Sequence, residues 1–251
     1  MELQVDAAPG IHRIEDDKTN WYLVEGDDDD GLTVVDAGVP RSWASLHEAL
    51  RRLGRDVRQI RAVVLTHAHF DHLGFAERAR TELRVPVLVH TDDVPLTKHP
   101  WRYDHERPRA LYFATQVQAL PNVARFVRDR AFWPPPVGEV VRYDDDAGTL
   151  DVPGRPRVIP TPGHTLGHCA LHFPQRDAVI AGDALVMLDP YTNRRGPRIV
   201  ARAATVDSER NRTTLEGISA TRAKHVLTGH GPVWDRGAEA AVAAARAAPV
   251  A

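Results

Sequence analysis

The feature that most constrains the fold is a short apolar run followed at once by a cluster of histidines. Residues 62–65 read Ala-Val-Val-Leu, a continuous apolar stretch typical of a β-strand that is covered on both faces. The next seven residues read Thr-His-Ala-His-Phe-Asp-His. Because residues two apart in an extended chain point the same way, His67, His69 and Asp71 can converge, while His72 can point elsewhere. The sequence therefore predicts a strand that presents several polar side chains at its end.

The side chains of this motif are those that borderline metal ions prefer, zinc above all. Histidine is the commonest metal ligand in proteins, and the chain contains 13 histidines. Without a metal, three imidazoles and a carboxylate crowded at one strand end would need several separate hydrogen-bond partners. We therefore interpret the motif as a metal-binding site.

The composition argues against several other classes of protein. A formal net charge of −2 gives no basic field for nucleic acid or for an anionic membrane surface. No apolar run approaches the roughly 20 residues of a membrane span, and the first residues do not resemble a signal peptide. The single cysteine, Cys169, cannot form an intrachain disulfide, which fits a reducing compartment. We expect a cytoplasmic protein without nucleic-acid or membrane partners; the oligomeric state stays open.

Strand-rich and helical segments alternate twice along the chain, which predicts one α+β domain over residues 1–251. Two such halves suit two sheets packed face to face with helices outside. In the first half we expect strands at 11–14, 20–25, 32–36, 62–65 and 86–90 and helices at 41–54 and 74–83. In the second half we expect strands at 140–143, 149–152, 157–160, 169–173, 178–181 and 224–228 and helices at 207–222 and 238–248.

Residues 91–137 interrupt this rhythm. The segment interleaves arginines with aromatic side chains, and we expect a helix over about 110–130 that the prolines at 134–136 bring to an end. Two interpretations remain open. The segment is either an inserted helical cap that lines a pocket, or an amphipathic helix packed on the scaffold with a charged outer face.

Three further candidate ligands follow predicted strands. His164 lies in a loop, 161–168, that reads Thr-Pro-Gly-His-Thr-Leu-Gly-His, and Asp183 and His230 each follow another strand. Loops at strand ends carry function on a rigid sheet, so we expect these residues to join the motif. We expect His168 to hydrogen-bond within its loop instead of binding a metal.

Together these residues resemble the metallo-β-lactamase-fold hydrolases. The matching pattern is His67-x-His69-x-Asp71-His72, then His164, Asp183 and His230, with Val-Asp-Ala-Gly at 35–38 upstream. The resemblance implies a four-layer αβ/βα sandwich with the site along one edge of the two sheets. It is highly specific for the fold and weakly specific for the substrate.

The resemblance also implies how the ligands divide between two metal ions, with Asp183 bridging both. The implied sets are His67, His69 and His164 for the first ion, and Asp71, His72 and His230 for the second. By the same resemblance, Asp36 orients the histidine loop without binding a metal, a role that also makes chemical sense. Five imidazoles and two carboxylates are in any case too many ligands for one tetrahedral zinc. We expect two zinc ions per chain, with iron or manganese as possible replacements.

Such a pair of ions lowers the pKa of bound water toward ~7 and stabilises a developing oxyanion. We therefore expect a dizinc hydrolase whose metal-bridging hydroxide attacks the carbonyl of a small thioester, lactone or ester. Asp71 or a metal-bound water can deliver the proton that the leaving group needs. Tyr191 lies near the position where the N-acyl-homoserine lactonases of this fold place a substrate-polarising tyrosine; its alternative role is packing alone.

Differences among subfamilies narrow the substrate. The 161–168 loop is similar to that of glyoxalase II thioesterases, although the C-terminus lacks their basic extension. The length and the ligand set resemble N-acyl-homoserine lactonases. The antibiotic-cleaving enzymes of the fold have a cysteine at the position of Asp183, which argues against β-lactamase activity.

Two other functions are compatible with the same fold. Persulfide dioxygenases hold one iron through two histidines and an aspartate, which would leave Asp71, His72 and His230 without a metal. A binding protein that has lost catalysis would bury unpaired ligands at a cost in free energy. An arginine cluster after Asp183 either binds a substrate carboxylate or faces solvent: Arg194, Arg195 and Arg198.

Overall fold

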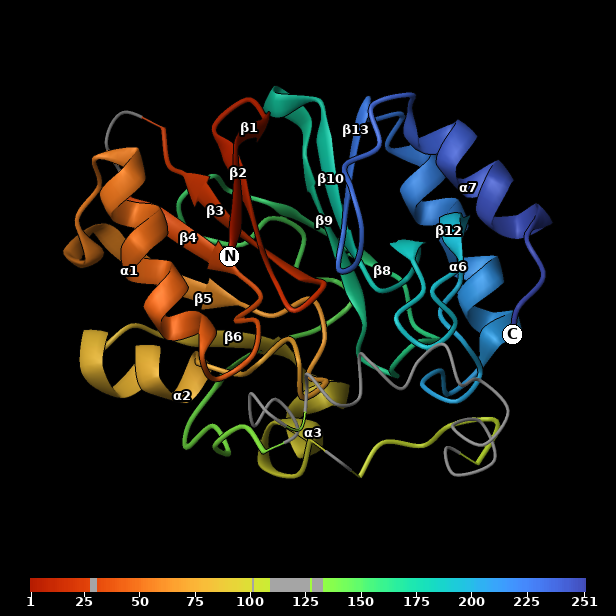
Figure 1. Ribbon diagram of the computed structural model, residues 1–251, viewed down its shortest axis with the longest axis horizontal. Helices are drawn as coiled ribbons and strands as arrows, with labels where there is room; N and C mark the ends of the chain where they lie inside the picture. The colour runs from red at the N-terminus through yellow and green to blue at the C-terminus, as the bar shows by residue number, and fades with distance from the viewer. Residues whose placement is uncertain (28–30, 101, 109–126, 128–132) are drawn as a thin grey trace.

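Each of the two large β-sheets is built from one continuous half of the chain (Figure 1). The computed structural model describes residues 1–27, 31–100, 102–108, 127 and 133–251. The first sheet, in the order β1-β2-β3-β4-β5-β6-β7, contains β1 (Glu2–Ala8), β2 (Ile11–Asp16), β3 (Thr19–Glu25), β4 (Leu32–Val35), β5 (Ile60–Val64), β6 (Val87–His90) and β7 (Val141–Tyr143). The second sheet, in the order β13-β10-β9-β8, contains β8 (Arg157–Pro160), β9 (Cys169–Phe173), β10 (Ala178–Gly182) and β13 (His225–Thr228).

Helices cover the outer faces of both sheets, with α1 and α2 on one side of the molecule and α6 and α7 on the other (Figure 1). Their bounds are α1 (Ser42–Leu53), α2 (Ala76–Arg78) with a π-helical turn at Ala79–Leu83, α6 (Ser208–Ala220) and α7 (Ala238–Ala247). A short helix, α3 (Val94–Lys98), follows a 3-10 turn at Thr91–Asp93. Within the described ranges, none of the helices is long and apolar enough to cross a membrane.

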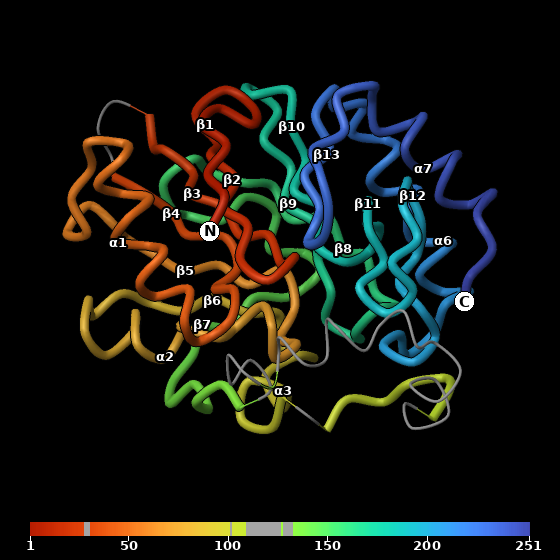
Figure 2. Tube along the Cα trace, in the orientation of Figure 1, coloured from red at the N-terminus to blue at the C-terminus, as the bar shows by residue number. Residues whose placement is uncertain are grey.

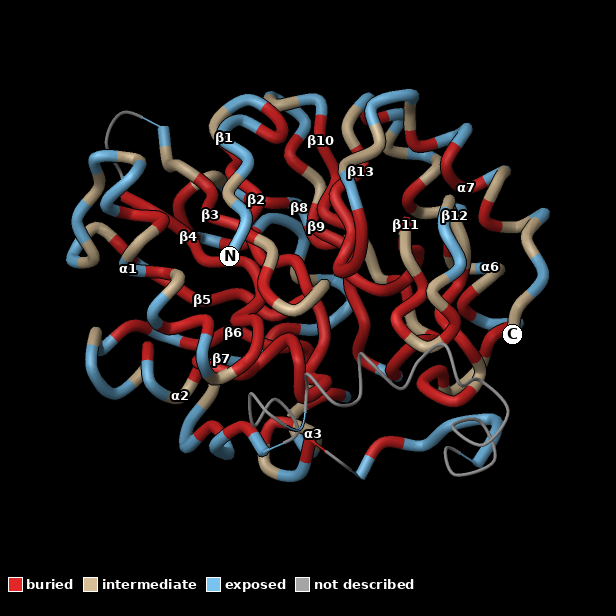
Figure 3. The backbone as a smooth tube through the Cα atoms, viewed as in Figure 1, coloured by how far each residue is buried: buried red, intermediate tan, exposed pale blue. Residues whose placement is uncertain are grey.

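The alternation of side chains along the strands explains the layers. Successive residues of a strand point to opposite faces of a sheet. In β5, Val63 packs in a buried cluster with α1, whereas Val64 packs between the two sheets. In β10, Ile180 packs between the sheets, whereas Val179 packs in a third cluster with α6 and α7. Three apolar layers therefore separate four layers of structure. Figure 3 shows central strands such as β4 and β10 as buried. The predicted αβ/βα sandwich is confirmed.

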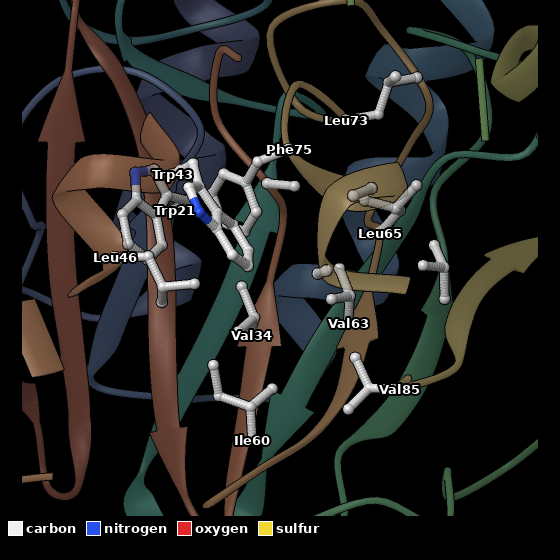
Figure 4. Packing of buried hydrophobic residues seen from close by; sticks show 14 of the residues in the cluster. Trp21, Val34, Trp43, Leu46, Ile60, Val63, Leu65, Leu73, Phe75 and Val85 are labelled. Atoms are coloured by element: carbon white, nitrogen blue, oxygen red, sulfur yellow. The ribbon is translucent and has the colours of Figure 1, made fainter. Parts of the chain in front are cut away.

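An aromatic cluster anchors the chain where it leaves the histidine motif (Figure 4). The ring of Phe75 packs edge-on against Trp21 at 5.3 Å between centroids and against Trp43 at 6.0 Å. The preceding residue, Gly74, donates its backbone N–H to the Gly38 carbonyl at 2.8 Å. A Cβ at Gly74 would overlap that carbonyl oxygen, so only glycine allows this approach. The downstream end of the motif is thus fixed to the first sheet.

The structure differs from the sequence-based expectations at several places. The edge strand β1 was not predicted, and β7, which we expected in the second half, joins the first sheet beside β6. The predicted strand at 149–152 is reduced to one bridge between Thr149 and Arg157, because the chain turns back at once and Leu150 N–H bonds to the Pro156 carbonyl. A two-stranded hairpin, β11 (Val186–Leu188) with β12 (Arg195–Arg198), was not predicted, since β12 carries a Gly-Pro pair and no apolar alternation.

Only the ends of the predicted insert, residues 91–137, are described. At its start the chain forms the 3-10 turn and α3, and after its end β7 pairs in parallel with β6, as Figure 2 shows at the edge of the first sheet. The helix expected over about 110–130, and with it the cap, lies outside the described residues except for position 127.

Candidate metal centre

The seven candidate ligands meet where four strands end. The motif after β5 of the first sheet carries four of them: His67, His69, Asp71 and His72. The second sheet supplies the other ligands from the loops after β8, β10 and β13, which run parallel to one another and so end at the same edge. All seven side chains are buried: His67, His69, Asp71, His72, His164, Asp183 and His230.

The ligands fall into two sets of three. In each set, one potential ligand atom of every residue lies within 4.8 Å of the others. The two sets are His67, His69 and His164, and Asp71, His72 and His230. This is the division that the resemblance implied. A third combination, Asp36 with His67 and His72, meets the same distance criterion, but the Asp36 carboxylate already accepts hydrogen bonds from its neighbours.

The Asp183 carboxylate faces both sets. Its Oδ2 atom lies 3.5 Å from His164 Nε2 and 3.2 Å from His230 Nε2. Its Oδ1 atom lies 3.7 Å from His72 Nε2. A group in this place can contact an ion in either set, as a bridging ligand must.

Hydrogen bonds hold the histidines through their Nδ1 atoms and leave Nε2 to face the centre. His72 Nδ1 bonds to Asp36 Oδ2 at 3.0 Å, and His230 Nδ1 bonds to the Lys18 carbonyl at 2.7 Å. His67 Nδ1 and His164 Nδ1 contact threonine hydroxyls, of Thr66 at 3.0 Å and of Thr205 at 3.4 Å. Metal-binding histidines are oriented in this way, by a partner on the nitrogen that does not bind the ion.

Several atoms that face the centre are buried and have no hydrogen-bond partner among the described residues. They are the Nε2 atoms of His67, His72 and His164 and the Oδ1 atom of Asp183. Buried polar atoms are rarely left unpaired, because each one loses its hydration without compensation. Their convergence from both sheets fits a bound cation, and imidazole nitrogens with carboxylate oxygens are a donor set that suits zinc.

The protonation of the site also fits ligands that are prepared for a cation. Burial holds the pKa of His67 well below its usual range and lowers the pKa of His164 to about 4, so both rings are neutral. Burial would also lower the pKa of His72, but the carboxylates of Asp183 and Asp71 raise it to about 10. The site therefore holds a proton where its carboxylates gather, and a divalent ion can supply that positive charge instead.

Two neighbours that the sequence singled out act through hydrogen bonds. Asp36 accepts from the Thr66 backbone N–H at 2.8 Å as well as from His72. His168 accepts the Asp183 backbone N–H on Nε2 at 2.9 Å, and its Nδ1 contacts the Thr161 hydroxyl at 2.8 Å. His168 therefore holds the backbone of Asp183 in place, in line with the expected hydrogen-bonding role.

An aromatic pair lies against the first set. The Tyr103 ring packs on the His69 ring at 4.0 Å between centroids, and its hydroxyl lies 3.4 Å from that of Tyr191. Tyr191, which the sequence singled out, is half-buried next to this ring. Tyr103 was missed; the only signal was the density of aromatic residues in the insert. In the arginine cluster, Arg194 and Arg195 are exposed.

The chain matches the family model of the metallo-beta-lactamase superfamily over residues 14–230, a range that contains all seven candidate ligands. The chain belongs to the metallo-β-lactamase superfamily. Membership explains why the polar loops lie along one edge of a four-layer sandwich.

Relatives within the superfamily support a hydrolase in general terms. The chain is 27% identical over 234 residues to the probable metallo-hydrolase YflN of Bacillus subtilis, which covers 90% of this chain and 85% of YflN. It is 23% identical over 163 residues to the hydroxyacylglutathione hydrolase GloC of Haemophilus influenzae, with 63% of each chain covered.

Solved structures show the same fold. The metallo-beta-lactamase family protein TTHA1429 of Thermus thermophilus aligns with a TM-score of 0.65 at 23% identity, over 94% of this chain and 79% of that one. TTHA1623, solved in a di-iron-bound form, aligns with a TM-score of 0.62 at 25% identity, over 91% of this chain and 95% of that one.

Proposed function

We propose that the protein is a dizinc hydrolase that cleaves a small thioester, lactone or ester. The observation that carries this proposal is the pair of three-residue sets on either side of the Asp183 carboxylate. Superfamily membership and the metallo-hydrolase relatives support hydrolysis. The di-iron form of TTHA1623 supports a centre with two ions and makes iron, like manganese, an alternative occupant.

Each candidate site residue has a role in this proposal. When bound, two zinc ions supply an activated water at neutral pH and a positive charge for the developing oxyanion. The histidines would hold the ions, and Asp183 would serve both positions. The Asp71 carboxyl, which accepts a hydrogen bond from Thr19 Oγ1 at 3.3 Å, transfers the proton that the leaving group needs. The Tyr191 hydroxyl polarises the substrate carbonyl.

The substrate class rests on two further observations. The 161–168 loop is similar to that of thioesterases of this superfamily, and GloC is a hydroxyacylglutathione hydrolase. Both favour thioesters within the proposed range. The aromatic pair of Tyr103 and Tyr191 beside His69 offers an apolar contact for an acyl chain.

Metal analysis together with a substrate panel tests the proposal. We expect about two zinc ions per chain in the zinc-loaded protein, and turnover of at least one class among thioesters, lactones and aryl esters. One iron per chain with oxygen uptake would contradict the proposal and indicate a persulfide dioxygenase-like enzyme. A folded protein that binds no metal would also contradict it and indicate a member that has lost catalysis.

Replacing Tyr191 with phenylalanine tests the proposed polarising hydroxyl. We expect Tyr191→Phe to lower kcat by ~100-fold, as the loss of one oxyanion-stabilising donor does, with little change in zinc content. Steady-state kinetics on the best substrate of the panel provide the measurement. An unchanged kcat would assign Tyr191 a packing role alone. The companion variant Tyr103→Phe keeps the ring on His69 and shows whether the effect belongs to Tyr191 or to the neighbouring hydroxyl.

A further inference from the structure

A buried carboxylate outside the ligand set joins the two loops that carry the first set of histidines. Asp93 is fully buried behind these loops. Its Oδ2 atom accepts the Ala68 backbone N–H at 2.9 Å and the Thr165 hydroxyl at 2.8 Å. Its Oδ1 atom accepts the Gly167 backbone N–H at 2.8 Å. Burial raises the pKa of Asp93, and these three hydrogen bonds act in the opposite direction.

The positions of these donors give the contact its meaning. Ala68 lies between His67 and His69, and Thr165 directly follows His164. One carboxylate thus bonds to the backbone that presents two ligands from the first sheet and to the loop that presents the third ligand from the second sheet. The Asp93 carboxyl group therefore spans the two loops.

Asp93 makes these contacts instead of the N-capping hydrogen bond that an aspartate at its position would usually make. Asp93 is the N-cap residue of α3, where an aspartate normally accepts a hydrogen bond from the first turn of the helix. Its side chain makes no such bond and is directed to the two loops instead. A buried carboxylate is costly, so its hydrogen bonds must be satisfied by the groups around it.

A glycine in the second loop makes the contact possible. A Cβ at Gly167 would lie 2.7 Å from the Asp93 backbone nitrogen and 2.8 Å from its Oδ1 atom. Any side chain there would push the loop, and His164 with it, away from Asp93. Asp36 is placed differently, because it bonds to His72 of the second set and to Thr66, whose hydroxyl contacts His67 of the first set.

We propose that Asp93 is a positioning residue that fixes the spacing of His67 and His69 against His164, and so sets the affinity of this set for its metal ion. The inference rests on the proposed dizinc function. It gives the two supporting carboxylates different roles, because Asp93 bonds to the loops of the first set, whereas Asp36 bonds to His72 of the second set and contacts His67 through Thr66.

Zinc titration of the demetallated protein tests this inference. We expect Asp93→Asn to weaken the binding of one of the two ions by ~10- to 100-fold, as the loss of a residue that orients ligands does, and to leave the other affinity within about two-fold. Asp92→Asn, an exposed neighbour on the same turn, is the matched control and should leave both affinities unchanged. Circular dichroism of the metal-free proteins confirms that the compared variants are folded.

Two single-set backgrounds identify the ion that is affected. With His230→Ala, which damages the second set, adding Asp93→Asn should weaken the remaining ion; with His164→Ala, which damages the first set, it should not. Equal weakening in both backgrounds would overturn the inference, because it would indicate a general structural effect. Thr165→Val, which removes one donor to Asp93, is the milder variant should Asp93→Asn fail to fold, and the same asymmetry is expected.

Failure of the inference and failure of the proposed function give different results. Wild-type protein that binds fewer than two zinc ions would overturn both. Wild-type protein that binds two ions, with Asp93→Asn binding both as tightly, would overturn the role of Asp93 and leave the dizinc proposal standing.

Discussion

Replacing Asp183 with asparagine is expected to disable both three-residue sets at once. The Asp183 carboxylate lies within 3.7 Å of Nε2 atoms from both three-residue sets. The Asp183→Asn variant keeps the size of the side chain but removes the negative charge that offsets two nearby cations. Loss of the several kcal/mol that metal ions contribute to the transition state corresponds to a fall in kcat of roughly 10³-fold or more.

The measurement combines zinc content with kcat on the best substrate of the panel. We expect the zinc content to fall from about two per chain to one or fewer. Asp151→Asn serves as the control, since Asp151 is exposed and forms a surface ion pair with the nearby Arg155. Full zinc content with unchanged kcat would show that Asp183 does not bridge two ions.

Replacing His69 with alanine is expected to abolish turnover while the protein stays folded. His69 belongs to the first set, and its ring lies 4.5 Å from that of His164 and 4.0 Å from that of Tyr103. Removing the imidazole takes one ligand from the first ion and a contact from the aromatic pair. We expect kcat to fall by roughly 10³-fold, with one zinc ion retained per chain.

The control for His69→Ala is His172→Ala, on β9 and only partly buried, which should leave kcat and zinc content unchanged. Thermal unfolding of the metal-free proteins checks that the two variants fold alike. Undiminished turnover of His69→Ala would refute the assignment of the first set.

The local sequence predicted a strand with metal-binding side chains at its end. It did not predict how these side chains divide into two sets. Strict alternation groups Asp71 with His67 and His69. The chain does not stay extended that far, because the His72 backbone N–H bonds to the His69 carbonyl at 3.0 Å and turns the chain between them. Asp71 is thereby directed to the second set, as the family resemblance implied and the spacing alone did not.

Two supporting residues, Asp93 and Thr205, could not be predicted, because their roles arise from contacts between distant segments. Asp93 bonds to Thr165 across 72 positions of sequence, and Thr205 contacts His164 across 41. Neither residue belongs to a motif that periodicity or spacing reveals. The order of strands and helices, in contrast, can be read along the chain, and it indicated two sheets packed face to face with helices outside. The four-layer sandwich itself was implied by the family resemblance.

Each three-residue set takes two ligands from the loop after β5 and the third from the second sheet. A cation held by either set would therefore crosslink the two halves of the chain. Because the ion binds the folded state, its binding raises the free energy of unfolding of the whole sandwich by mass action. Conversely, a substitution in the apolar layer between the sheets that shifts one half relative to the other would first appear as a lower affinity for the metal ion. Metal affinity at the candidate centre would thus report how well the two halves of the chain pack together.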